Sequence, residues 1–328
     1  MITKNTVFIL GAGASADFGF PLGEELREKI YSNLLKNVAY VTSLAQALAG
    51  AWPDEANEYK RAIAKFAEAL RHALDYSIDA FLERFQTTYL KIGKLAIAQA
   101  LVDSENHDKL FEKDNWYKIL VNEMKNGATI DNFHQNKVSF VTFNYDRSLE
   151  HLLYTVLCNF HEKANQSWAA NVIKRIPIVH LYGKLDSLPW ETSEPDKGRT
   201  YGRPYSHAQL KEYNNGIGIV FEDIGEGTKS NFEKASALLE AAERIYILGF
   251  GFDPENTLRL GLDKLINRKK IVHATSYELN AQRMGHLLDK LVNIRTFTPG
   301  NMEKDFSDGL GLYPVKAYTF LKEIADLR

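Results

Sequence analysis

The residues best placed to do chemistry follow short apolar runs at widely separated points of the chain. The first group is the turn Gly11-Ala12-Gly13-Ala14-Ser15-Ala16, which fits the G-x-G-x-x-G/A pattern of dinucleotide-binding turns. In that pattern Gly11 permits the tight turn, Gly13 lets a pyrophosphate approach the backbone, and the small Ala16 allows close packing of helix on sheet. We therefore expect this turn to hold phosphate groups, although an ordinary tight turn between strand and helix could have the same sequence.

Two further apolar runs end in polar side chains. Val138–Phe143 is followed by Asn144 and Asp146, and Ile176–Leu181 carries His180 near its end. Open α/β sheets bind their ligands beyond the carboxyl ends of parallel strands, so these side chains could share one site with the first turn. Each also has a structural explanation: Asn144 as a turn residue, Asp146 as a helix N-cap, and His180 as a core histidine.

An alternation of strand and helix would position these residues. Short apolar runs predict buried strands at Val7–Leu10, Val138–Phe143, Ile176–Leu181, Ile217–Phe221, Ile245–Leu248, Ile271–Ala274 and Ile294–Phe297. Apolar spacing of three and four predicts helices at Gly23–Lys36, Val41–Leu48, Ala56–Leu74, Ile78–Val102, Leu110–Met124, Arg147–Leu157, Phe232–Ala242, Glu255–Ile266, Ala281–Leu291 and Val315–Leu327. This order predicts an α/β fold with a Rossmann-like parallel sheet and helices on both of its faces.

Strand signals are absent between residues 37 and 134, where every predicted element is helical. We interpret 37–134 as a large helical insertion after the first βα unit, within a single domain that covers 1–328. A dehydrogenase would instead show a second strand roughly 20 residues after the glycine turn, ending in an acidic residue for the ribose. Because Leu26–Lys36 is helical, the sequence argues against a hydride-transfer enzyme.

The glycine turn continues to Phe20 and Pro21, so that Gly11–Pro21 follows the pattern G-A-G-A-S-x-x-x-G-x-P. This stretch resembles the opening signature of the sirtuin superfamily, in which the loop after the phosphate turn covers the nicotinamide end of NAD. Thr142–Asp146 is similar to the T-x-N-x-D segment of the same superfamily. The resemblance implies that Asn144 contacts the ribose and the attacking water, and that Asp146 contacts the nicotinamide carboxamide.

Sirtuins carry their catalytic histidine in an H-G dipeptide after the next strand, which implies that His180 acts as the base. This chain has Leu181 and Tyr182 between His180 and Gly183. That variation looks like the divergent prokaryotic sirtuin-like NAD hydrolases of antiphage defence.

Later stretches extend the resemblance. Ile219–Glu222 looks like the V-x-F-G-E stretch of sirtuins without its glycine. Gly249-Phe250-Gly251 lies in the place of the sirtuin G-T-S turn, where it could bind the ribose–phosphate portion of NAD. Ser276 follows a strand where sirtuins hold the adenosine ribose with an asparagine. The implied NAD-binding residues are Gly11, Ala12, Gly13, Ser15, Phe20, Pro21, Gly249, Phe250, Gly251 and Ser276.

The predicted reaction is cleavage of the nicotinamide–ribose bond of NAD+. Nicotinamide leaves as a neutral molecule, so the site needs orientation, stabilisation of an oxocarbenium-like sugar and a base for water, but no acid. Deacetylating sirtuins also carry a zinc module with four cysteines, whereas this chain has one cysteine, Cys158, and hence neither that module nor a disulfide. We expect no zinc, and hydrolysis to nicotinamide and ADP-ribose in preference to deacylation. An NAD-dependent deacylase or ADP-ribosyltransferase, and a non-catalytic NAD or ADP-ribose sensor, remain alternatives.

The composition of the chain argues against nucleic acid and membranes as partners. The formal net charge of −2 and the pI near 6.5 provide no broad positive field for nucleic acid or an anionic membrane. No stretch approaches the roughly 18 apolar residues of a membrane helix, and no signal-peptide pattern is present, so we expect a cytoplasmic protein. The resemblance to defence NAD hydrolases implies a homo-oligomer or a separate defence subunit of ATPase or nuclease type.

Overall fold

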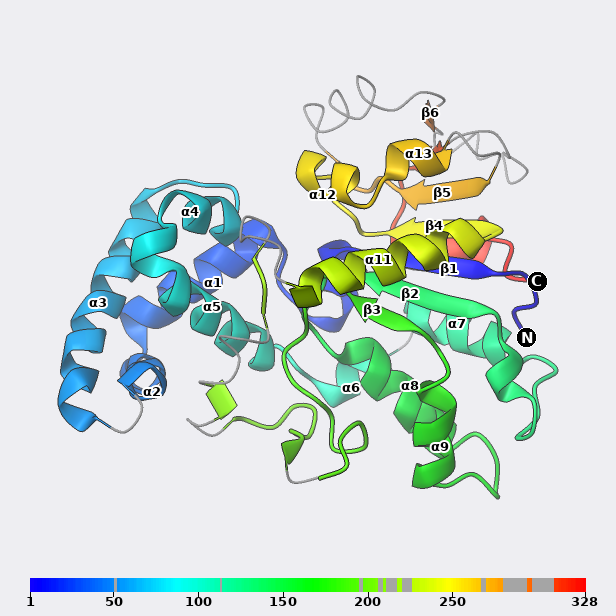
Figure 1. Ribbon diagram of the computed structural model, residues 1–328, viewed down its shortest axis with the longest axis horizontal. Coiled ribbons are helices and arrows are strands. Elements are labelled where there is room, and N and C mark those ends of the chain that lie inside the picture. The colour runs from blue at the N-terminus through cyan, green and yellow to red at the C-terminus, as the bar shows by residue number, and fades with distance from the viewer. Residues whose placement is uncertain are drawn as a thin grey trace.

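The sheet of the computed structural model has seven parallel strands in the order β3-β2-β1-β4-β5-β7-β6 (Figure 1). The structure describes residues 1–49, 52–112, 114–194, 197–205, 209–210, 217–219, 226–266, 270–279, 294–296 and 310–328. The strands are β1 Thr6–Leu10, β2 Val138–Thr142, β3 Ile178–His180, β4 Arg244–Leu248, β5 Ile271–Thr275, β6 Ile294–Thr296 and β7 Leu310–Tyr313. This arrangement confirms the predicted α/β fold class.

The central strand β1 is buried on both sides, which is why its sequence is a continuous apolar run. Val7 and Ile9 point to one face of the sheet, and Phe8 and Leu10 point to the other, where they join separate hydrophobic clusters. On the first face these residues pack with α11 (Glu226–Ala241) and α13 (Leu262–Ile266). Each face of the sheet therefore has its own helical cover.

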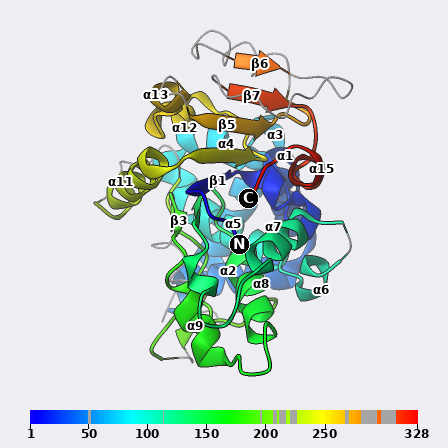
Figure 2. The ribbon, with the colours of Figure 1, turned by 90° about the vertical axis from the view of Figure 1, so that its right-hand side faces the viewer.

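The opposite face is covered by α7 (Trp116–Lys125) and α15 (Ala317–Glu323), which also contact each other. Figure 2 shows α11 on one side of the sheet and α7 and α15 on the other. The helices α8 (Ser148–Cys158) and α9 (Gln166–Ile173) pack together beside β2 and β3. Among the described helices, none combines the length and the apolar character that a membrane span requires.

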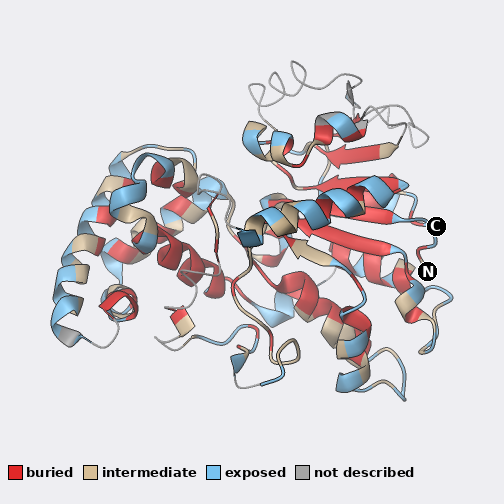
Figure 3. Ribbon diagram, in the orientation of Figure 1, coloured by how far each residue is buried: buried red, intermediate tan, exposed pale blue. Residues whose placement is uncertain are grey.

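The carboxyl ends of the strands face a group of helices that contains α1 to α5 (Figure 1). These are α1 Gly23–Lys36, α2 Val38–Ala49, α3 Pro53–His72, α4 Ile78–Arg84 and α5 Gln86–Val102, followed by the short α6 His107–Leu110. Every residue of α5 from Ile92 to Val102 is buried, so this helix forms the centre of the group (Figure 3). Two short 3-10 segments, η1 (Ala12–Ala14) and η2 (Ala16–Phe18), connect β1 to this region.

Several predicted elements differ in detail. The helix expected at Ile78–Val102 is interrupted at Phe85, and the helix expected at Glu255–Ile266 forms α12 (Pro254–Arg259) and α13, separated at Gly261 with φ +66°. The start expected for the helix Leu110–Met124 is wrong by six residues, since α7 begins at Trp116. The helix expected at Ala281–Leu291 lies outside the described residues.

The strand expected at Ile217–Phe221 is wrong for the residues that are described, 217–219. Ile217 makes only an isolated antiparallel bridge with Gly183. Strand β7, which lies between β5 and β6, and helix α9 were not predicted from the sequence.

Candidate functional site

A cavity of about 700 Å³ lies at the carboxyl ends of β1, β2 and β4, between the sheet and the helices α1, α4 and α5. Its size falls within the roughly 300–1,000 Å³ that ligand sites occupy. Most of the predicted site residues line it: Gly11, Ala12, Gly13, Ser15, Phe20, Pro21, Asn144, Asp146, Gly249, Phe250 and Gly251. His180 and Ser276 do not belong to its lining, although Thr275 and Tyr277 on either side of Ser276 do.

The two glycine turns pack directly against each other. The Gly13 amide donates to the Gly249 carbonyl oxygen at 2.9 Å, and the Gly11 amide donates to the Leu248 carbonyl oxygen at 3.0 Å. A Cβ on Gly11 would lie 2.6 Å from the Gly249 oxygen, and a Cβ on Gly249 would lie 2.1 Å from the Ala14 nitrogen. Glycine at these positions thus has a cause that the sequence analysis did not foresee, the contact between the turns after β1 and β4.

Backbone contacts within the first turn decide which amides could meet a phosphate. Those of Ala14 and Ser15 donate to carbonyl oxygens of the turn itself, at 2.9 and 3.0 Å, and that of Gly13 is taken by the second turn. The amides of Ala12 and Ala16 have no backbone acceptor in the described part of the chain. A phosphate held by this turn would therefore meet Ala12 and Ala16 rather than Gly13.

The Asn144 side chain is fixed against the first turn. Its Nδ2 donates to the Gly11 carbonyl oxygen at 2.9 Å and to Ser15 Oγ at 3.0 Å. Because a carbonyl oxygen can only accept, these contacts determine which end of the amide faces the turn. Within the described residues Oδ1 has no partner, so it is an oriented acceptor for a ribose hydroxyl or a water in the cavity.

Asp146 links the first turn to the start of α8. Its Oδ2 accepts from Ser15 Oγ at 2.7 Å, and its Oδ1 accepts from the Ser148 amide at 3.0 Å and from Ser148 Oγ. Burial raises the pKa of Asp146, while the hydrogen bonds from Ser148 and Ser15 lower it in part. Each Asp146 oxygen thus accepts from a neighbouring element, Oδ2 from Ser15 and Oδ1 from Ser148 at the start of α8. Asp146 is not the helix N-cap that the sequence predicted, because α8 begins at Ser148 and its N-cap is Arg147.

His180 makes two contacts that fix its protonation. Nδ1 lies 2.8 Å from the Asn144 carbonyl oxygen, and Nε2 lies 2.7 Å from Glu150 Oε1. Burial alone would raise the pKa of Glu150, but His180 and Lys184 outweigh burial and lower it to about 2, so Glu150 is ionised. Burial likewise opposes charge on His180, and Glu150 overcomes it, so that the pKa of His180 is raised.

Both partners of His180 are therefore acceptors, and both ring nitrogens must carry a proton. The imidazolium form cannot take a proton from water, and the ring does not line the cavity. These contacts differ from the base role expected for His180. They give the residue a supporting role, in which it holds the Asn144 backbone at the edge of the cavity.

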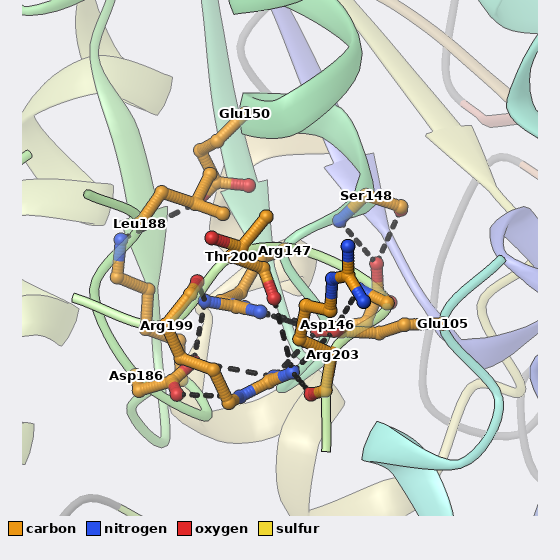
Figure 4. A network of polar contacts seen from close by, with 12 residues as sticks. Glu105, Asp146, Arg147, Ser148, Glu150, Asp186, Leu188, Arg199, Thr200 and Arg203 are labelled. Atoms are coloured by element: carbon orange, nitrogen blue, oxygen red, sulfur yellow. Dashed lines mark hydrogen bonds and ion pairs between the residues drawn. The ribbon is translucent and has the colours of Figure 1, made fainter. Parts of the chain in front are cut away.

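A buried ionic network fixes the segment after β3 beside the site (Figure 4). Glu105, with a fully buried side chain, accepts from Arg147 at 2.8 Å and from Arg199 at 2.8 Å. Asp186 pairs with the same two arginines, and the Gly202 amide donates to Glu105 at 2.9 Å. Since Arg147 directly follows Asp146, the network ties this segment to the same strand end that carries Asn144.

Most of the charged side chains that line the cavity are acidic. Among its described residues Lys316 is the one basic side chain, and the acidic ones are Asp17, Glu25, Asp79, Asp146, Asp253 and Glu278. Burial raises the pKa of Asp79 to about 6, and the nearby Asp253 adds to the effect. This charge pattern favours a ligand that carries a cationic group. In the described part of the chain, no three His, Cys, Asp or Glu side chains are grouped as metal ligands would be.

Tyr182 and Asn256 also line the cavity, and the sequence analysis did not identify either as a site residue. The Tyr182 hydroxyl donates to Asn256 Oδ1 at 2.6 Å and accepts from Arg259 Nη1 at 3.2 Å. The available signal was the dipeptide that Tyr182 forms with Gly183, since the residue directly before glycine is the catalytic one in the sirtuin pattern.

No protein family and no curated protein matches this chain, so its site is interpreted from its own geometry.

Proposed function

We propose that this chain is an NAD+ hydrolase that cleaves the nicotinamide–ribose bond in the cavity at the carboxyl edge of the sheet. The observation that carries the proposal is the orientation of Asn144, which lines the cavity with its amide nitrogen held by Gly11 and Ser15 and its oxygen without a partner among the described residues. The side chain that would orient a ribose is thereby hydrogen-bonded to the turn that would hold the phosphates. This arrangement suits a ligand that contains both a ribose and phosphates.

The rest of the cavity fits NAD+ as a substrate. The amides of Ala12 and Ala16 and the turn Gly249–Gly251 could receive the pyrophosphate. The acidic lining suits the nicotinamide ring, which is positively charged until the bond breaks. NAD+ should consequently bind more tightly than ADP-ribose, which has the same phosphates without the cationic ring.

The reaction consumes one water and releases a proton: NAD+ and water give nicotinamide, ADP-ribose and H+. The bond between C1′ and the nicotinamide nitrogen breaks with its electron pair on nicotinamide, and the water oxygen bonds to C1′. Asn144 Oδ1 can accept a hydrogen bond from that water or from a ribose hydroxyl, and such positioning is worth several kcal/mol of a barrier. With His180 already protonated, the proton of the water passes to solvent.

Release of nicotinamide from NAD+ tests the proposal. Asn144→Ala should lower the rate about 10²-fold or more, since it removes an oriented group that acts at the reacting ribose. Asn159→Ala is a matched control, because Asn159 is exposed at the end of α8 and, among the described residues, its side chain donates only to the Thr155 carbonyl oxygen. Equal rates for the two variants would contradict the role given to Asn144.

The proposed biological setting, regulated NAD+ depletion in antiphage defence with a homo-oligomer or a separate ATPase or nuclease subunit, rests on the sequence resemblance alone. An NAD+ or ADP-ribose sensor is a second candidate. It is favoured by one observation, the protonated His180 that lies outside the cavity lining. Tight binding of NAD+ without nicotinamide release would support the sensor over the hydrolase.

A further inference from the structure

In the H-L-Y-G stretch the side chain that lines the cavity is Tyr182 and not His180, the residue for which the sequence predicted a role in the site. Strand β3 ends at His180, and the chain then turns, with the Gly183 amide donating to the His180 carbonyl oxygen at 3.3 Å and Gly183 at φ +83°. After this turn the Tyr182 side chain lines the cavity, whereas that of His180 pairs with Glu150 behind it. Tyr182, two residues after the end of β3, is thus the polar residue of this stretch that lines the cavity.

Two aromatic rings and two polar side chains hold the Tyr182 side chain in place. The ring packs against Phe143 and Phe232, with centroid distances of 6.1 and 5.6 Å. Its hydroxyl oxygen accepts from Arg259, so the phenolic proton goes to Asn256 Oδ1 at 2.6 Å. The residue is 3% exposed, and the position of its hydroxyl is therefore fixed.

This contact orients Asn256 in turn. Its Oδ1 faces Tyr182, so its Nδ2 group is directed away from that hydroxyl, and Nδ2 has no partner among the described residues. Asn144 has the opposite arrangement, with the nitrogen bound and the oxygen available. The cavity consequently presents one oriented amide acceptor, Asn144, and one oriented amide donor, Asn256.

From this pairing we infer that Asn256 is a ligand-binding residue that donates to an acceptor oxygen of the substrate, and that Tyr182 is the positioning residue that orients it. The inference rests on the proposed function, because it takes NAD+ as the ligand. Phosphate, ribose and carboxamide oxygens of NAD+ are all acceptors for such a donor. Tyr182 therefore acts through Asn256 and does not serve as a base.

A double-mutant cycle on the full chain tests this assignment, with NAD+ as the probe in both binding and nicotinamide-release measurements. Asn256→Asp keeps the shape and removes the donor, and it should weaken NAD+ binding roughly tenfold or more. Tyr182→Phe keeps the ring packing, and it should weaken binding about fivefold because Asn256 loses its orientation. The double variant should be no worse than Asn256→Asp alone, since the tyrosine acts only through the asparagine.

The controls are Tyr154→Phe and Asn159→Asp, both outside the cavity lining, which should leave binding unchanged. Wild-type protein that neither binds nor cleaves NAD+ would overturn the proposed function, and this inference with it. If the wild type binds NAD+ and Asn144→Ala impairs the reaction while Asn256→Asp does not, the inference alone is overturned. Fully additive effects of Tyr182→Phe and Asn256→Asp would overturn the positioning role of Tyr182.

Discussion

Replacing Gly249 by alanine should damage both the fold and the site, because two glycine turns meet at this residue. Gly249 has φ +60°, and a Cβ there would lie 2.1 Å from the Ala14 nitrogen and 2.2 Å from the Gly13 carbonyl carbon. The left-handed backbone costs a non-glycine residue about 1–2 kcal/mol. Relief of the clash must move the turns apart by about an ångström or more, which is a large displacement for backbone packed on backbone.

That displacement would break two hydrogen bonds of the turns. Gly249 accepts from the Gly13 amide at 2.9 Å and donates to Thr275 Oγ1 at 2.8 Å, and each bond is worth about 0.5–1.5 kcal/mol. Together with the backbone cost, Gly249→Ala should lower the free energy of unfolding by roughly 2–5 kcal/mol. The separated turns should also fail to bind NAD+.

Gly127→Ala provides the matched control. Gly127 has φ +71°, but a Cβ there would meet no atom within 4 Å, so only the backbone cost of about 1–2 kcal/mol applies. Urea unfolding of wild type and both variants measures the difference. If Gly249→Ala is no more destabilising than Gly127→Ala, or if it binds NAD+ like the wild type, the argument from the contact between the turns is refuted.

Three further predictions concern charge, pH and the first turn. Glu105→Gln leaves two buried guanidinium groups with the carboxylate of Asp186 between them, so one buried positive charge loses its counter-charge. This change should lower the free energy of unfolding by about 3–5 kcal/mol in urea titrations. Because the pKa of Glu150 is lowered to about 2 and that of His180 is raised, their pair stabilises most between pH 4.5 and 6.5, the ordinary values of the two groups. The difference in the free energy of unfolding between wild type and His180→Gln should shrink as the pH rises through the raised pKa of His180. It should also shrink as the pH falls from 4.5 towards 2. A difference that does not vary with pH would refute the pairing. Ala12→Pro removes a backbone amide that has no acceptor in the described part of the chain. NAD+ binding should therefore weaken roughly tenfold, while the melting temperature should change little. Unchanged binding would show that this amide does not contact the ligand.

The sheet was predictable where its strands are continuous apolar runs. Val7–Leu10 and Ile245–Leu248 are buried on both faces, and their sequences contain the apolar residues that such burial requires. Strand β7 was missed because it has only four residues, one of which is glycine, and because its identity depends on pairing with β5 and β6. The interruption at Phe85 of the helix predicted for Ile78–Val102 was not predicted, because no glycine or proline lies at that point of the sequence.

The site was predictable in part for the same reason. Asn144 and the first glycine turn follow neighbouring parallel strands, so their meeting at one edge follows from the fold. The presence of Tyr182 rather than His180 in the cavity lining had the Tyr182-Gly183 dipeptide as its one sequence signal, because it depends on where β3 ends and on distant contacts. One of these is the hydrogen bond of 2.8 Å from the Gly218 amide to the Tyr182 carbonyl oxygen.

A crystal structure with NAD+ or a non-hydrolysable analogue would show whether the substrate ribose lies at Asn144. We expect the pyrophosphate beside Ala12 and Gly249, and the nicotinamide-side ribose within hydrogen-bond distance of Asn144 Oδ1. A dinucleotide that binds elsewhere, or one whose ribose points away from Asn144, would contradict this expectation.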